Sequence, residues 1–150
     1  MRLMNGLDIS SSALTAQRLR MDVISSNIAN AETTRGRLVN GQWTPYTRKL
    51  VVMEPKGQAS FADTLRGTMH NKTGEGVKAT KIVEDSSPFK QVYNRTHPDA
   101  DANGFVSMPN VDILKEMVDM ISATRAYEAN VTALNASKAL IMKALEIGRQ

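Results

Sequence analysis

The stretch that decides the fold is Glu116 to Gly148, EMVDMISATRAYEANVTALNASKALIMKALEIG. Apolar residues recur through it at alternating steps of four and three, which is the spacing of a coiled-coil seam. Starting one turn upstream, the seam positions are Ile113, Met117, Met120, Thr124, Tyr127, Val131, Leu134, Lys138, Ile141 and Leu145. The sequence therefore predicts one long helix, capped at its start by Asn110 or Asp112 and closed by Gly148.

A line of small residues lies next to this seam, where a second helix can approach closely. Its members are Ala123, Ala126, Ala129, Ala133 and Ala136. Three polar residues of the same helix, Asn130, Thr132 and Asn135, have two interpretations. Either they are solvated, or they bond across helices and set the register, as a buried Asn does in coiled coils.

The first part of the chain has the same rhythm and predicts a second long helix, from a start between Asn5 and Asp8 to about Ala31. Gly6 weakens any earlier start, Asp8 is a candidate cap, and Gly36 ends the segment. The seam, with two polar interruptions at Ser10 and Gln17, is Leu3, Leu7, Ser10, Leu14, Gln17, Met21, Ile24, Ile28 and Ala31.

The section between the helices has a different character. Its β-branched residues, bounded by Pro and Gly, predict short strands. The candidates are YTRKLVVMEP (46–55), GVKATKIVED (76–85), FKQVYN (89–94) and FVSM (105–108). Residues 56–76 are rich in Gly, Thr, Ser and Lys and predict an exposed loop.

We therefore expect an α+β fold that is mostly helical, in which two long terminal helices pair as a coiled coil. The expected segments are an N-terminal coiled-coil helix and turn at 1–36, a β-rich insert with an exposed loop at 37–110, and a C-terminal coiled-coil helix at 111–150.

The two predicted helices are too long for a compact body of this size. At about 1.5 Å per residue they extend roughly 40 Å and 50 Å, whereas a compact domain of this length has a radius of gyration near ~15 Å. Each large apolar side chain left in water forgoes roughly 1.5–3 kcal/mol. We therefore predict completion by assembly, within the subunit or across to neighbours, through a seam of Leu14, Met21, Ile24, Ile28, Met120, Tyr127, Val131, Leu134, Ile141 and Leu145.

Composition narrows the class of protein. The 150 residues are 41% hydrophobic, 23% charged and only 5% aromatic, with 9 Met, which suits long helices and adaptable interfaces. The net charge is +4, but no basic run resembles a nucleic-acid arm, so a nucleic-acid partner is not expected. With no cysteine, the chain has no disulfide framework, thiolate zinc site or Cys nucleophile.

DADANG (99–104) places two aspartates, an asparagine and a glycine at positions one, three, five and six of an EF-hand calcium loop. The twelfth position of such a loop is a bidentate carboxylate, but here it is Asn110. A strand-like segment ending in Pro98 also replaces the entering helix. The sequence favours an Asn-Gly turn that leads into the strand at 105–108. A calcium-dependent enzyme or sensor is the less favoured interpretation of DADANG.

No catalytic, metal or cofactor site is predicted. His70 and His97 are far apart and lack the i, i+4 spacing of a metal site, and no Ser lies in an elbow between two Gly. No stretch is apolar enough to cross a bilayer, and residues 1–20 have no hydrophobic segment of the secretory type. We expect either a cytoplasmic chain or one exported with its N-terminus uncleaved.

Several segments resemble the family of bacterial flagellar rod and hook proteins. SALTAQRLRMDVISSNIANAETTR (12–35) looks like the N-terminal signature of that family, centred on Ser26, Asn27, Ile28, Ala29 and Asn30. Residues 116–148 resemble the shared C-terminal helix. IVEDSSPFKQVY (82–93) and HPDADANGFVSMPNVD (97–112) resemble the proximal-rod member specifically, and the short insert agrees.

The resemblance implies a structural subunit of the flagellar basal body, with neither a small-molecule substrate nor a nucleic-acid partner. Such subunits pass uncleaved through the flagellar type III export apparatus. They self-associate and join other rod proteins and the base of the basal body, including its membrane-embedded ring, in a hollow torque-transmitting shaft needed for motility. Their terminal helices line the inside as coiled coils, and the β-rich insert faces outward. On this basis we expect Asn27 and Asn30 to fix the turn out of the N-terminal helix.

The alternative is a soluble cytoplasmic coiled-coil adaptor that dimerises through the same seams. Both hypotheses need the apolar spacing of the helices, so the helical pattern does not choose between them.

Overall fold

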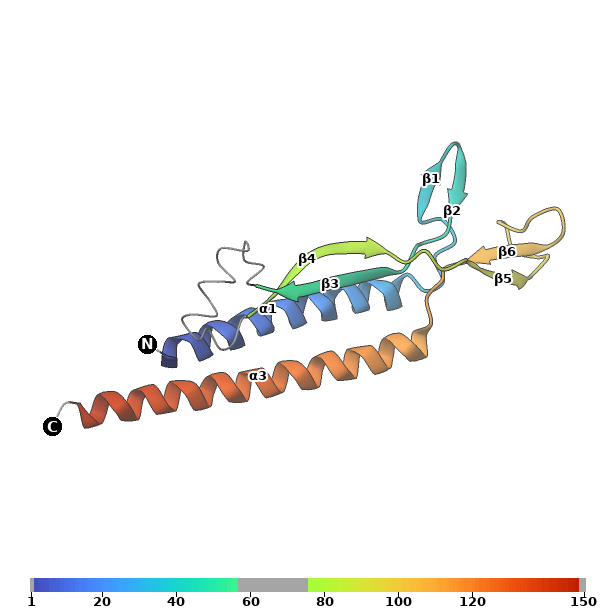
Figure 1. Cartoon of the computed structure of the whole chain (residues 1–150). Helices are drawn as coiled ribbons and strands as arrows, with labels where there is room; N and C mark the ends of the chain where they lie inside the picture. The colour runs from blue at the N-terminus through green and yellow to red at the C-terminus, as the bar shows by residue number, and fades with distance from the viewer. Residues whose placement is uncertain (1, 57–75, 149–150) are drawn as a thin grey trace. The chain divides into compact units, whose positions relative to one another are not determined.

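The computed structural model describes residues 2–56 and 76–148 (Figure 1). Its elements are α1 (Arg2–Ala29), β1 (Arg37–Val39), β2 (Gln42–Thr44), β3 (Lys49–Pro55), β4 (Val77–Glu84), β5 (Lys90–Tyr93), β6 (Phe105–Met108) and α3 (Ile113–Ile147). The fold is α+β and mostly helical, with strand pairs between two long helices in the chain. Apart from its end residues, the loop expected at 56–76 lies outside the described residues.

Helix α3 has the bounds that its sequence predicts. The carboxylate of Asp112 accepts the backbone N–H of Leu114 at 3.1 Å, so Asp112 is the cap and Asn110 is free for another role. The helix runs for 35 residues, about 52 Å at the usual rise, and ends directly before Gly148. The backbone N–H of Gly148 still donates to the carbonyl of Ala144 at 3.1 Å.

Helix α1 begins earlier and ends earlier than expected. It starts at Arg2, so Gly6 lies inside the helix and Asp8 is not its cap. A Cβ placed on Gly6 would lie 3.8 Å from the Oγ of Ser137, so this turn packs against α3. Such packing offsets the cost of about 1 kcal/mol that a glycine imposes on a helix.

The end of α1 is set by an asparagine rather than by Gly36. The side-chain amide of Asn30 donates to the carbonyl of Ser26 at 2.9 Å, and the hydroxyl of Thr33 donates to the Asn30 oxygen at 3.2 Å. The Ser26 carbonyl also accepts the backbone N–H of Asn30 at 3.1 Å, and the next N–H, from Ala31, turns to the carbonyl of Ile28 at 3.2 Å, so α1 stops at Ala29. Gly36 instead lies at the foot of the β1–β2 hairpin, where a Cβ would sit 2.7 Å from the backbone nitrogen of Tyr46.

The strands form three two-stranded pairs, β1–β2, β3–β4 and β5–β6. The four strands predicted from the sequence are confirmed as β3, β4, β5 and β6. The β1–β2 hairpin was not predicted, although Asn40 and Gly41 at its tip both have positive φ. Such an Asn-Gly pair is the strongest short signal of a tight hairpin turn.

The chain forms two compact units, and their boundaries differ from those of the three expected segments. Unit 1 consists of Met1–Leu19, Val52–Lys81 and Ala123–Gln150, and unit 2 consists of Arg20–Val51 and Ile82–Ser122. Each unit therefore takes part of both helices and of the strands between them.

In unit 1, α1 contacts both α3 and the start of β4. Ala16 and Ala123 are buried there, and their small side chains suit closely packed helices. The hydroxyl of Ser12 accepts the backbone N–H of Val77 at 3.1 Å.

In unit 2, α1 and α3 run antiparallel, because Arg20 pairs with Asp119 while the later Asn27 bonds to the earlier Glu116. The apolar core of this unit is Val23, Ile24, Val106 and Val111. Within the described residues, no helix is both long enough and apolar enough to span a membrane.

Candidate functional site

The core of unit 2 contains a cluster of polar side chains from distant parts of the chain. We call it the polar hub, and its members are Asn27, Tyr46, Arg48, Asp85, Asn110 and Glu116. They come from the last turns of α1, the segment before β3, the residue after β4, the approach to α3 and the first turns of α3. The hub therefore fixes the place where the strands meet both helices.

An ion pair between Arg48 and Glu116 is the centre of the hub. The Nε and Nη2 atoms of Arg48 both lie 2.6 Å from Oε1 of Glu116. The side chains are 11% and 1% exposed, so water hardly reaches the pair. The same guanidinium lies 3.4 Å from Asp85 and 3.7 Å from Asp119, and Asp119 also pairs with Arg20.

Asn27 connects this ion pair to the strand side of the hub. Its Nδ2 donates to Oε2 of Glu116 at 3.0 Å and to the carbonyl of Lys49 at 2.9 Å. Its Oδ1 accepts the Tyr46 hydroxyl and the Lys49 backbone N–H, both at 3.0 Å. The amide thus uses both donors and both acceptor sites while it is buried, which avoids the cost of an unpaired polar group.

Asn110 makes the corresponding connection on the approach to α3. Its Oδ1 accepts the backbone N–H of Arg48 at 2.8 Å. Its Nδ2 donates to the carbonyls of Asp85 and Ser87, at 3.2 and 3.1 Å. Backbone groups that lie outside any strand pair thereby obtain partners.

Two hub residues, Asp85 and Arg48, have pKa values that are shifted by their partners. Hydrogen bonds from the hydroxyl and the backbone of Ser87, together with Arg48, lower the pKa of Asp85. Burial alone would lower the pKa of Arg48, but the hydrogen bonds and charges of Glu116 and Asp85 outweigh it and raise that pKa. Both shifts favour the charged forms of Asp85 and Arg48.

A second polar contact explains the first aspartate of DADANG. Oδ2 of Asp99 accepts the Thr34 hydroxyl at 2.8 Å, and Oδ1 accepts the Nε–H of Arg35 at 2.7 Å. The bonds from Arg35 and then Thr34 lower the pKa of Asp99, and the same contact raises the pKa of Arg35. The carboxylate joins the loop before β6 to the segment after α1.

The rest of DADANG is a turn, as the sequence favours. The backbone N–H of Gly104 donates to the carbonyl of Asp101 at 2.7 Å, and Gly104 has φ +82°. The backbone N–H of Asp101 donates to the carbonyl of Phe105 at 2.8 Å. Among the described residues, no three His, Asp or Glu side chains gather in a way that fits a metal ion.

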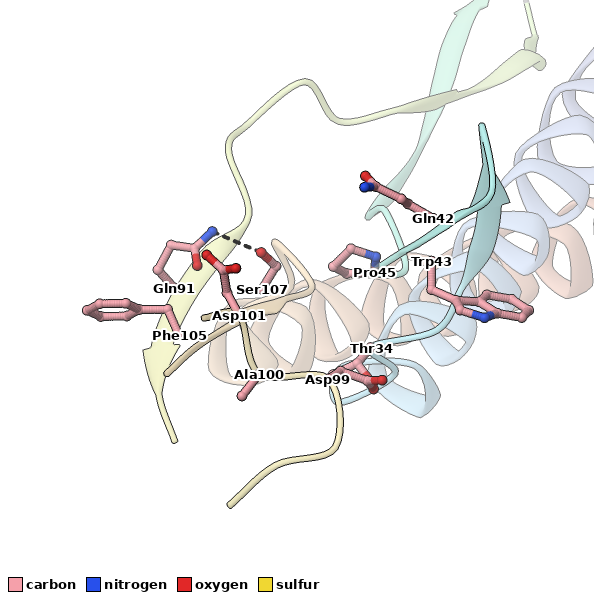
Figure 2. Close-up of a pocket in the computed structure, with 10 residues that line it drawn as sticks. All are labelled: Thr34, Gln42, Trp43, Pro45, Gln91, Asp99, Ala100, Asp101, Phe105 and Ser107. Carbon is pink, nitrogen blue, oxygen red and sulfur yellow. Dashed lines mark hydrogen bonds between the residues drawn. The ribbon is translucent and has the colours of Figure 1, made fainter. Parts of the chain in front are cut away.

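An open hollow of about 510 Å³ lies between β2 and the β5–β6 pair (Figure 2). Its walls include Gln42, Trp43, Asp99 and Phe105, and Gln91 bonds to Ser107 across the strand pair at 3.0 Å. No histidine or cysteine is among its lining residues, and Asp99 is held by Arg35. The hollow therefore combines aromatic side chains with polar ones, and its Asp99 is already engaged by a neighbouring cation.

Most residues of the predicted assembly seam face inward at least in part. Ile24 is buried and Leu145 is 66% exposed. The partly buried members are Leu14, Met21, Ile28, Met120, Tyr127, Val131, Leu134 and Ile141. In the family motif, Ser26 lies 3.4 Å from the Tyr46 hydroxyl, Ile28 is partly buried and Ala29 is exposed.

The opposite face of α3 carries an apolar stripe that nothing in the described residues covers. Leu114, Val118 and Ile121 are 76%, 67% and 61% exposed, and Ile113 and Met117 extend the stripe at its edge. We call these five residues the outer stripe. At this end α3 therefore has an apolar outer face, while its inner face carries Glu116 and Asp119.

Sequence reasoning missed Arg48, Asp85 and Glu116. Glu116 is an acid in the first turn of a helix, which a sequence explains by the helix dipole alone. A stronger signal is its position: Glu116 stands three residues after Ile113 and four before Met120, where a core-facing residue is expected. Its partner Arg48 is 68 residues away, so no local pattern connects them.

Comparison with known proteins gives two family matches and several full-length relatives. Residues 7–36 match the model "Flagella basal body rod protein", and residues 102–147 match "Flagellar basal body rod FlgEFG protein C-terminal". Between the matches lie the strand pairs β1–β2 and β3–β4 together with β5.

Three of the relatives named "Flagellar basal-body rod protein FlgC" illustrate the similarity. The chain is 57% identical to the one from Bacillus subtilis, with 99% of this chain and 100% of the relative covered. It is 43% identical to the one from Escherichia coli O157:H7, with 99% and 100% covered. It is 42% identical to the one from Borreliella burgdorferi, with 98% of both chains covered.

Proposed function

The chain belongs to the FlgC family of flagellar basal-body rod proteins, and we propose that its two long helices join it to neighbouring subunits of the rod. It is a structural protein of the flagellar basal body and not an enzyme. Its partners are accordingly other rod and basal-body proteins.

The outer stripe is the observation that carries this proposal. Its five large apolar side chains follow one another over less than three turns of α3, while the opposite face of the same turns is buried against the hub. Burial of each such side chain contributes roughly 1.5–3 kcal/mol when complete. A neighbouring subunit that covers the outer stripe would recover this energy.

The finer arrangement that we propose is a coiled-coil seam. Helices α1 and α3 contact each other in antiparallel order within unit 2, and their apolar residues keep the coiled-coil spacing. The same seam can also continue between subunits, because a contact between two different surfaces of one chain repeats into a filament. The alternative of a cytoplasmic adaptor receives no support from full-length relatives that are all named rod proteins.

We also propose that the protein is exported by the flagellar type III apparatus and lies in the proximal part of the rod, near the base of the basal body. The support is the resemblance of residues 82–93 and 97–112 to the proximal-rod member, together with the names of the relatives. A simple check is whether the protein copurifies with basal bodies from a parent strain but not from one without the export apparatus.

Deletion of the gene in its own organism tests the rod function. We expect cells without external filaments that do not swim, and full recovery when the unchanged gene is supplied. Val118→Asp, which puts a charge into the outer stripe, should fail to restore swimming although the protein accumulates. Lys115→Asp is the matched control, because it introduces the same charge at an exposed position beside the stripe.

Normal swimming of the deletion strain would contradict the rod function. Normal swimming with Val118→Asp would contradict the role of the outer stripe and leave the rod function intact.

A further inference from the structure

The central ion pair of the polar hub is a poor source of stability. Glu116 is almost completely enclosed and Arg48 nearly so. Removing two charges from water costs several kcal/mol per ion, and their attraction often does no more than repay that cost. An apolar pair of similar volume in the same place is commonly as stable or more stable.

The pair does, however, strongly constrain the relative orientation of the segments that it joins. Two nitrogens of Arg48 converge on one oxygen of Glu116, while Asn27 holds the other oxygen. The backbone of Arg48 is held in turn by Asn110. Hydrogen bonds lose strength steeply as they bend, whereas apolar contacts tolerate sliding and rotation.

The bonded groups also come from segments that only the fold brings together. Asn27 lies in the last turn of α1, Arg48 precedes β3, and Glu116 lies in the first turns of α3, 68 positions after Arg48. The direction of these bonds therefore constrains how the start of α3 is set against the strands of unit 2. The outer stripe lies on the same turns of α3, so this direction also decides where the stripe faces.

We propose that the polar hub is an orientation lock, which holds the start of α3 in one direction against the strands of unit 2 and adds little net folding stability. The lock acts within unit 2 and does not depend on the proposed rod function. If the hub simply stabilised the fold, its removal would lower the free energy of unfolding and widen the spread of orientations together. Removal of an orientation lock widens the spread of orientations and leaves the free energy of unfolding nearly unchanged.

The variant Arg48→Met/Glu116→Leu removes the lock together with both charges of its central ion pair. Asp119 keeps Arg20, Asp85 keeps Ser87, and the Asn27 amide keeps the carbonyl of Lys49. The single variant Arg48→Met leaves the Glu116 carboxylate buried without a cation, whereas Glu116→Leu leaves Arg48 with its longer contacts to Asp85 and Asp119. The matched control is Arg125→Met/Glu128→Leu, the same changes in an exposed ion pair of α3.

Urea unfolding of the full chain measures how each variant changes the free energy of unfolding. Arg48→Met should lower the midpoint by about 1–2 M, because Glu116 is left in the core without a cation. Glu116→Leu should lower it less, because Arg48 keeps its contacts with Asp85 and Asp119. The double hub variant should return to the parent midpoint or exceed it. The control variant should stay near the parent, because exposed pairs contribute little. A double hub variant as unstable as Arg48→Met would overturn the proposal.

Distances between two spin labels measure the orientation of the start of α3 relative to the strands of unit 2. The chain has no cysteine, so Ala102→Cys and Ser122→Cys, both exposed in unit 2, supply the only two attachment sites. We expect one narrow distance distribution in the parent and in the control variant. In the double hub variant, the width should increase at least twofold. An unchanged width in a stable double hub variant would overturn the proposal.

Discussion

At the scale of single residues, buried polar side chains and not the apolar ones give this molecule its specific connections. Ile24 and Val106 need only an apolar neighbour, and many residues would serve. Asn27 needs particular partners for each of its polar atoms, and it finds them on Tyr46, Lys49 and Glu116. Replacement of such a residue is therefore costly in a way that its small size does not suggest.

Asn27→Ala should lower the free energy of unfolding by at least about 2 kcal/mol, because it leaves several buried donors and acceptors unpaired. Urea unfolding measures the difference. Asn135→Ala is the matched control, since it makes the same change at an exposed position of α3. The control should stay within about 0.5 kcal/mol of the parent. Equal effects of the two variants would contradict the role given to Asn27.

Asp99 predicts a pH dependence. Its pKa is lowered in the folded state, so its contact with Arg35 and Thr34 stabilises the fold above about pH 4, and this contribution is lost as the pH falls through the lowered pKa. Asp99→Asn lacks the contribution at every pH. The gap in urea midpoint between parent and variant should therefore be wide at pH 7 and narrow towards pH 3. A gap of constant width would show that the charge of Asp99 is not the cause.

At the scale of elements, the regular pattern of apolar residues predicts most of the helices and strands, whereas the turn residues carry a signal that this pattern lacks. The strands β3 to β6 and the end of α3 follow from β-branched runs and from Gly148. The β1–β2 hairpin was missed because its strands are only three residues long, although Asn40 and Gly41 mark its turn. The early start of α1 was missed because tertiary contact at Gly6 outweighs local propensity.

The two positive-φ glycines give a prediction about turns. Gly41 and Gly104 both have φ +82°, so replacement by Ala strains the backbone by roughly 1–2 kcal/mol at either position. Gly41 has open space around a new Cβ, whereas at Gly104 the Cβ would lie 2.7 Å from Arg95 and 3.0 Å from Tyr93. Gly104→Ala should therefore destabilise more than Gly41→Ala in thermal unfolding. The reverse order would contradict this account of the β5–β6 turn.

At the scale of the whole molecule, the sequence predicts the family and the mostly helical class, because both follow from patterns along the chain. It does not predict the polar hub or the two compact units, which depend on pairings such as Arg48 with Glu116 across 68 residues. The predicted seam was chosen by spacing alone. Leu114, Val118 and Ile121 of the outer stripe lie on the other face of the same helix, and only side-chain exposure distinguishes the two faces. Ile113 and Met117, which the spacing places in the seam, are 43% and 51% exposed and lie at the edge of the stripe.

The central claim is that neighbouring rod subunits cover the outer stripe, and the absence of cysteine from the chain permits a direct test. Val118→Cys is treated with a thiol reagent, once in the purified monomer and once in isolated basal bodies, and the labelled fraction is measured after denaturation. We predict rapid labelling in the monomer and at least tenfold slower labelling in the basal body. Equally rapid labelling in both would contradict the claim.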